Sequence, residues 1–243
     1  MTIFFASLMF GDAGFYIDTW YLVLVIPALI LSLIASAAVK GTFNKYSQQV
    51  SQSGHTGQSA ARAILDRHGL SSVPIERVAG QLTDHFDPKS NILRLSESTY
   101  ASNSIAAIGV AAHEAGHAVQ FAEGFWANKI RGFLVPVAQI GSSFGPYMAI
   151  FGIFGGIPWL TTIGIVLFAG AVLFYLITLP VEINASQRAI RVLEDQGLLN
   201  NEELVGAKKV LRAAAMTYIA SALVAFASLL RLILLSRGRN GRR

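Results

Sequence analysis

Long apolar stretches separated by polar segments form the dominant pattern of the chain. No charged residue occurs in residues 19–39, 132–181 or 213–230, which are 21, 50 and 18 residues long. About 20 apolar residues cross a bilayer as a helix. The first stretch therefore predicts one span, the second predicts a hairpin of two spans, and the third predicts a shorter fourth span. The hairpin turn is expected at residues 155–158, Gly-Gly-Ile-Pro, because two glycines and a proline break a helix.

Two polar segments, residues 40–132 and 182–212, carry 14 of the 19 basic residues. Basic residues beside spans favour the cytoplasmic face, so both segments are expected there, with the N-terminus outside. The basic tail after residue 236 conflicts with this rule if the last stretch crosses fully. Either the two larger segments determine the orientation, or the last stretch packs without crossing.

The first polar segment mixes helix and strand patterns. A helix around residues 60–65 is expected to end at His68-Gly69, and strands are expected at residues 74–78, 82–86 and 92–95, with a turn at 87–91. A second helix runs from Ser102 or Ser104 to about Ala122. The fold class predicted is an α+β integral membrane protein, mainly helical, with about four transmembrane helices and a small β-sheet subdomain carrying the second helix.

This pattern divides the chain into five segments. They are an N-terminal segment with the first span (1–40), a polar domain (41–132), the membrane hairpin (133–181), a second part of the polar domain (182–212), and the last apolar helix with the basic tail (213–243).

Composition narrows the class of protein further. Hydrophobic residues make up 53% and charged residues 14% of the 243 positions, and the mean hydropathy is +0.51. This number of charged residues is too small to cover the surface of a water-soluble globule of this size. The lipid bilayer is therefore expected to contact much of the surface. The net charge of +5 lies beside apolar spans, which favours a membrane face over nucleic acid. The absence of cysteine excludes disulfides and thiolate-ligated metals.

The second helix carries the residues with the clearest chemistry. His113 and His117 are four residues apart, so their imidazoles lie on one face of a helix and can converge on one Zn²⁺ ion, while Glu114 projects beside them toward a water molecule. The alternative is a pair of surface histidines with an incidental glutamate. Three ionisable groups in a helix otherwise rich in alanine are costly unless they bind something, which favours a metal site.

A catalytic zinc ion has three protein ligands, and no histidine follows His117. A carboxylate is therefore expected to be the third ligand. Glu182 ends the 50-residue apolar stretch, where the hairpin returns to the level of the histidine helix, and is the preferred candidate; its alternative role is to mark the membrane interface. Glu123 lies too close to His117 along the same helix, and the remaining downstream carboxylates lie in polar surface sequence: Glu194, Asp195, Glu202 and Glu203.

Four segments carry a resemblance to a known family: residues 82–88 (LTDHFDP), 93–96 (LRLS), 104–120 (SIAAIGVAAHEAGHAVQ) and 179–189 (LPVEINASQRA). The chain resembles the YugP-type neutral zinc metallopeptidases of prokaryotic membranes from about residue 21 to 235, and its layout is similar to that of HtpX-like membrane gluzincins. The resemblance implies a membrane zinc peptidase with metal ligands at His113, His117 and Glu182 and the catalytic glutamate at Glu114. Ser186 stands where gluzincins commonly place an aspartate that orients a histidine.

These observations predict a zinc-dependent endopeptidase of the cell membrane whose site faces the cytoplasm and whose partner is a peptide or protein substrate. The strand at residues 91–95 either pairs with an extended substrate or is a plain buried strand. His85 either stabilises an oxyanion or is structural, and Arg188 and Tyr175 are further candidates by proximity to Glu182 alone. The alternative function is a membrane protein that binds zinc for structure or transport.

Overall fold

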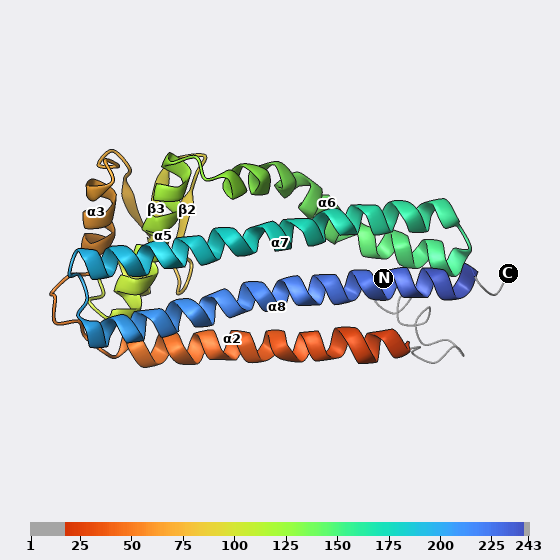
Figure 1. Ribbon diagram of the computed structural model, residues 1–243, viewed down its shortest axis with the longest axis horizontal. Helices are drawn as coiled ribbons and strands as arrows, with labels where there is room; N and C mark the ends of the chain where they lie inside the picture. The colour runs from red at the N-terminus through yellow and green to blue at the C-terminus, as the bar shows by residue number, and fades with distance from the viewer. Residues whose placement is uncertain (1–17, 241–243) are drawn as a thin grey trace.

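Four long helices lie along the long axis of the molecule (Figure 1). The computed structural model describes residues 18–240, with side chains to residue 238. Each of the four helices is long and apolar enough to cross a membrane, which confirms the expected number of spans. The predicted N-terminal segment before residue 18 and the end of the basic tail lie outside the described residues. The helices are η1 (Tyr21–Val25) continuing into α2 (Ile26–Ser47), α6 (Trp126–Gly155), α7 (Pro158–Asp195) and α8 (Asn201–Asn240).

The turn between α6 and α7 falls where the sequence predicts it. Gly156 has a left-handed backbone (φ 67°) that ends α6, and Pro158 is the first residue of α7. A glycine can end a helix because it tolerates a positive φ. A proline can begin the next helix because an amide in the first turn has no partner within the helix. The 50-residue apolar stretch is therefore a helical hairpin.

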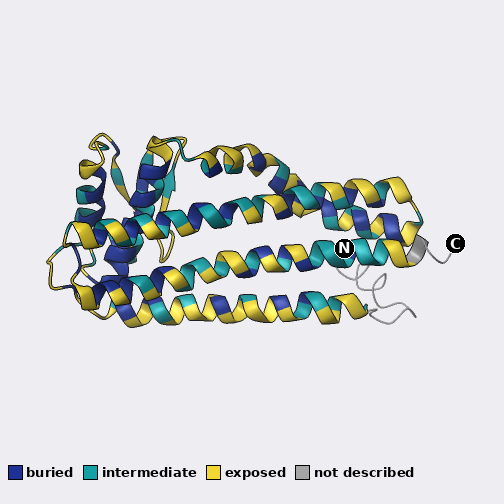
Figure 2. Cartoon of the chain, in the orientation of Figure 1, coloured by how far each residue is buried: buried dark blue, intermediate teal, exposed yellow. Residues whose placement is uncertain are grey.

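Large apolar side chains remain exposed along this helical bundle. Leu33 is 71%, Phe133 77% and Val166 64% exposed, and exposed residues line the outer faces of the long helices (Figure 2). An apolar surface of this extent requires a non-aqueous environment, and a bilayer supplies it.

Polar and aromatic side chains mark the two ends of the apolar region. On α7, 23 residues separate Trp159 from Glu182, which corresponds to about 35 Å of helix. On α8, Arg212 and Arg231 are 19 positions apart, or about 29 Å. A hydrocarbon core is about 30 Å thick, so Glu182 and Arg212 both lie at one boundary of the predicted membrane region.

The last apolar stretch extends along the whole bundle. α8 ends near the turn of the α6–α7 hairpin (Figure 1), and Arg231 forms an ion pair with Asp18 (Nη2 to Oδ2, 2.6 Å) before the first span. Arg231 also lies over the Tyr21 ring, 5.0 Å from its centroid. α8 is therefore long and apolar enough to cross with the other three helices, and full crossing stays a prediction.

The polar elements gather at the opposite end of the bundle (Figure 1). Thr56 and Ser59 form a reciprocal capping box at the start of α3, and Ser104 caps α5 by accepting from the Ala107 amide. The two helices predicted in the first polar segment are thus confirmed; the start of α5 at Ser104 was expected, whereas the capping box of α3 was not predicted. The elements here are α3 (Gly57–Arg67), β1 (Ile75–Val78), β2 (His85–Asp87), β3 (Ile92–Ser96), α4 (Glu97–Tyr100) and α5 (Ile105–Ala122).

The three strands form a mixed sheet in the order β1-β3-β2. β3 pairs in parallel with β1 and antiparallel with β2, so it is the central strand. Of the two alternatives for residues 91–95, the structure supports the plain buried strand, because neighbouring strands already occupy both edges of β3. β2 begins later than the predicted strand at residues 82–86. Leu82 has a positive φ of 56°, and the Asp84 side chain accepts hydrogen bonds from the Ser96 backbone amide and hydroxyl.

One hydrophobic core joins this polar end to the long helices. It includes fully or almost fully buried side chains from five elements: Leu65, Leu93, Ile108, Leu193 and Leu211. α7 and α8 pass without a break through the predicted segment boundaries at 181/182 and 212/213. The membrane helices and the polar domain thus share the same continuous helices.

Glycines allow α6 and α7 to pack closely within the membrane region. A Cβ on Gly145 would lie 2.9 Å from both the Gly164 carbonyl oxygen and the Phe168 Cβ. Small residues at such an interface let two helix backbones approach, which is a principal source of helix association in lipid.

We expect Gly145→Ala to destabilise the protein by roughly 1–3 kcal/mol, because the new methyl group overpacks a backbone contact. Gly132→Ala on the same helix is the matched control: its Cβ would meet nothing within 4 Å, so alanine should be neutral or stabilise by up to about 1 kcal/mol. Thermal unfolding in detergent measures both variants. Equal midpoints would contradict the described helix contact.

Candidate metal centre

Three side chains from two helices converge at the boundary of the membrane region. His113 and His117 lie one turn apart on α5, and Glu182 comes from α7. The two imidazole Nε2 atoms are 3.2 Å apart, and Glu182 Oε2 lies 3.3 Å from the first and 3.5 Å from the second. Within the described residues this is the group of His and carboxylate side chains close enough to share one ion.

These separations fit a tetrahedral metal site. Zn²⁺ binds imidazole nitrogen and carboxylate oxygen at about 2.0–2.2 Å, so the edge between two ligands of a tetrahedron is about 3.3–3.5 Å. Two imidazole nitrogens and a carboxylate oxygen that face one another at this range repel through their lone pairs unless a cation or protons lie between them. The donor set of two nitrogens and one oxygen is one that zinc prefers.

Each histidine ring is oriented by a hydrogen bond on its other nitrogen. The Ser186 hydroxyl lies 3.1 Å from His113 Nδ1, and Gln120 Oε1 lies 3.0 Å from His117 Nδ1. Partners of this kind fix ring orientation and tautomer in metal sites, leaving Nε2 for the ion. The sequence singled out Ser186 by its spacing from Glu182, whereas Gln120 was missed.

Gln120 also connects the two helices that carry the cluster. It is fully buried, and its amide nitrogen donates to the Val181 carbonyl and to Asn184 Oδ1, both at 2.9 Å. Its oxygen thereby remains free to face His117. One side chain thus holds α5 to α7 and orients a ring of the cluster; its spacing of three residues after His117 is the signal that identifies it.

The two helices approach closely beside the cluster. A Cβ on Gly116 would lie 3.0 Å from the Ala185 carbonyl oxygen. Gly116 sits between the two histidines in sequence, and only a residue without a side chain leaves α7 room at this distance. This close approach brings Glu182 within reach of both rings.

Two donors hold Glu182 from other helices. Arg131 Nη1, at the start of α6, lies 3.5 Å from Glu182 Oε1, and the Tyr218 hydroxyl of α8 interacts with the same carboxylate. Glu182 is only 3% exposed, and a buried carboxylate requires such partners. Both residues were missed because they are far from Glu182 in sequence and belong to no motif.

Glu114 occupies the space between the cluster and the sheet. Its Oε2 accepts a hydrogen bond from the Phe86 backbone amide of β2 at 3.2 Å, and packing of Phe86 against Phe121 (ring centroids 5.8 Å apart) holds β2 on α5. Burial raises the pKa of the Glu114 carboxyl above its ordinary value, more than the neighbouring imidazoles lower it. The carboxylate is thus near the cluster without belonging to it.

The other candidates lie outside the three-residue cluster. His85 is exposed, with Nδ1 2.8 Å from the Thr83 carbonyl, which agrees with a structural role. Tyr175 packs against Phe174. The carboxylates that were set aside as ligands have other roles or are solvent-exposed: Glu123 pairs with Arg188, Glu203 accepts the Gln52 and Asn200 amides, and Glu194, Asp195 and Glu202 are exposed.

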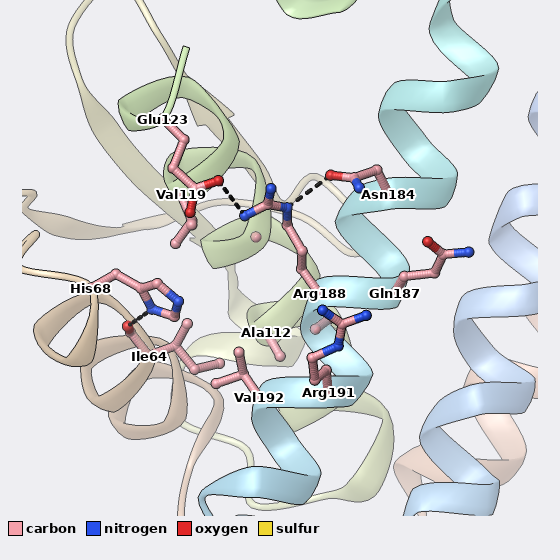
Figure 3. Close-up of a pocket in the computed structure, with 12 residues that line it drawn as sticks. Ile64, His68, Ala112, Val119, Glu123, Asn184, Gln187, Arg188, Arg191 and Val192 are labelled. Carbon is pink, nitrogen blue, oxygen red and sulfur yellow. Dashed lines mark hydrogen bonds and ion pairs between the residues drawn. The ribbon is translucent and has the colours of Figure 1, made fainter. Parts of the chain in front are cut away.

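Arg188 reaches the cluster only through other residues. It forms an ion pair with Glu123 at 2.7 Å and donates to Asn184 Oδ1 at 2.8 Å, as Figure 3 shows, beside a pocket of about 260 Å³. Asn184 accepts from Gln120, which contacts His117. Arg188 is therefore a supporting residue of the α5–α7 contact.

Comparisons with known proteins agree with this chemistry. Residues 21–237 match a family described as "putative neutral zinc metallopeptidase". A protein of Bacillus subtilis (strain 168) named "Putative membrane protease YugP" is 46% identical over 215 residues, covering 88% of this chain and 96% of that protein. No solved structure matches the chain.

We expect Ser186→Ala to weaken zinc binding roughly 10–100-fold, because His113 loses the partner that orients its ring. Ser142→Ala, at an exposed position on α6, is the matched control and should bind as the native chain does. Competition with a chromophoric chelator at pH 7 measures the affinity. An unchanged affinity in Ser186→Ala would show that the hydroxyl does not support the ring.

Proposed function

Because the chain belongs to the family described as putative neutral zinc metallopeptidases, we propose that it is a membrane-embedded, zinc-dependent endopeptidase. The observation that carries the proposal is the cluster of His113, His117 and Glu182, whose donor atoms lie 3.2–3.5 Å apart, with the Glu114 carboxylate beside it. Three protein ligands and an adjacent glutamate are the arrangement of a catalytic zinc site with one position left for water or substrate.

His113, His117 and Glu182 would hold the ion, and Ser186 and Gln120 orient the two imidazoles toward it. When bound, Zn²⁺ polarises the scissile carbonyl and lowers the pKa of water. A nearby cation also favours the ionised form of Glu114, opposing the effect of burial. The proposed mechanism uses this ionised form of Glu114.

Glu114 acts as the general base and then as the general acid. It takes a proton from the attacking water and delivers that proton to the leaving amine nitrogen, so one carboxyl group serves both halves of the hydrolysis. The Phe86 amide, 3.2 Å from Glu114 Oε2, holds the carboxylate in place. Arg131 and Tyr218 position the ligand Glu182 from the opposite side.

The outer edge of β2 is the proposed docking edge for the substrate. β2 pairs with β3 on one side only, and the Phe86 amide faces Glu114 rather than β3. An extended peptide that pairs with this edge would pass directly beside Glu114. Its main-chain hydrogen bonds would supply binding free energy that does not depend on the peptide sequence.

The site would face the cytoplasm at the surface of the cell membrane. Glu182 lies at the boundary of the predicted membrane region, and the two polar segments around the site carry most of the basic residues, which favour the cytoplasmic side. The substrates proposed are peptides or proteins presented at or in the bilayer.

The alternative is a membrane protein that binds zinc for structure or transport. A structural site has four protein ligands, whereas three candidate ligands meet within the described residues. A transport path has ionisable residues inside the spans, whereas residues 132–181 contain none. Neither alternative gives a role to Glu114.

The base is tested by Glu114→Gln in the purified full-length chain. We expect cleavage of unfolded casein to fall by about 10²–10⁴-fold, with zinc content by elemental analysis unchanged, because glutamine keeps the shape and loses the proton acceptor. Glu182→Ala is the contrasting variant and should lose both cleavage and zinc. Full activity of Glu114→Gln would overturn the mechanism.

The orientation is tested by cysteine labelling, since the native chain has no cysteine. Ser53 is exposed at the polar end, and Gly238 is exposed near the end of α8. We expect a membrane-impermeant maleimide to label Gly238→Cys in intact cells and Ser53→Cys only after lysis. The reverse pattern would place the site outside the cell, and labelling of both from one side would contradict four complete spans.

A further inference from the structure

A groove of about 650 Å³ between α7 and α8 has no role in the proposed chemistry. Three basic side chains line it, Arg191 of α7 and Lys208 and Arg212 of α8. Arg191 and Arg212 are exposed and Lys208 is half-buried. Within the described residues none of the three forms an ion pair closer than 4 Å, and Glu194 is the one carboxylate among the lining residues. Three positive charges against one negative charge select an anion.

The remaining walls of the groove are apolar. Four apolar residues line it: Ile183, Ile190, Leu211 and Ala215. Free phosphate gains no binding free energy from apolar walls, whereas an amphiphile gains binding free energy by burying its hydrocarbon chain against them. The combination of cationic groups and aliphatic walls fits a ligand that carries both an anionic head and an acyl chain.

The groove lies at the level where a lipid headgroup resides. Ile183 follows Glu182 at the boundary of the apolar region, and Ala215 is three residues inside the uncharged stretch that begins after Arg212. The apolar end of the groove therefore meets the hydrocarbon. Arg191 and Lys208 lie about two helical turns beyond Ile183 and Ala215, in the interfacial region of the bilayer.

We propose that this groove binds an anionic phospholipid, with the phosphate between Arg191, Lys208 and Arg212 and an acyl chain along Ile183 and Ala215. Ser186 also lines the groove, and its hydroxyl lies 3.1 Å from His113 Nδ1. The bound lipid would thus lie next to Ser186, the residue that orients the His113 imidazole of the candidate metal centre. The binding itself does not depend on the proposed peptidase activity.

The test is native mass spectrometry of the full-length protein in detergent, titrated with phosphatidylglycerol or with phosphatidylcholine. Each basic side chain near an anionic lipid contributes about fivefold to affinity. We expect Arg191→Gln with Lys208→Gln to weaken phosphatidylglycerol binding about thirtyfold, and Arg191→Gln alone about fivefold, with little change for phosphatidylcholine. The single variant keeps the test valid if the double variant is unstable.

The control separates a specific groove from a diffuse basic surface. Lys45 and Lys209 lie at the same end of the bundle beside the α2–α8 pocket, so Lys45→Gln with Lys209→Gln removes equal charge away from the groove. This variant should retain phosphatidylglycerol binding. Equal losses in the two double variants, equal affinity for the two lipids, or displacement of the lipid by millimolar inorganic phosphate would each overturn the proposal.

Discussion

The contact between α5 and α7 is the constraint on which the candidate centre depends. Two of the candidate ligands lie on α5 of the polar end and the third lies on the long helix α7, so the candidate centre exists only where these backbones come close together. Gly116 permits the approach, and Gln120 secures it by bonding across to α7 while facing His117. Buried hydrogen bonds of this kind are costly to break, because each lost partner leaves a polar group unsatisfied. Packing and ligand geometry are therefore determined by the same few side chains.

The features that the sequence predicted correctly are local. Uncharged runs revealed the four apolar helices because lipid penalises every charge within a span, and the Gly-Pro turn was visible because each residue has a distinct backbone requirement. Ser104 and Gly124 framed α5. Glu182 was found through its position at the end of an apolar run, and the structure places it beside His113 and His117; its role as a ligand stays a prediction, as does that of both histidines.

What the sequence missed depends on contacts between distant segments. The order of the strands could not be deduced, because each strand is compatible with a central or an edge position until pairing is known. Both alternatives for residues 91–95 stayed open for that reason. Arg131 and Tyr218 approach Glu182 from helices separated from it by 51 and 36 residues, and no spacing rule connects them. Gln120 lies three residues after His117, but its bonds to Val181 and Asn184 of α7 could not be deduced from that spacing.

The unbroken course of α7 has a mechanical consequence. About 36 Å of helix separate Pro158, at the far membrane boundary, from Glu182, and the helix continues without a break to Asp195. If this length of helix tilts as one body, a change of about 2° displaces the Glu182 carboxylate by roughly 1 Å, which is half the length of a metal–oxygen bond. Bilayers of different thickness change helix tilt. We therefore expect the position of Glu182 to depend on bilayer thickness and lateral pressure, and a detergent micelle is a different mechanical environment from a bilayer.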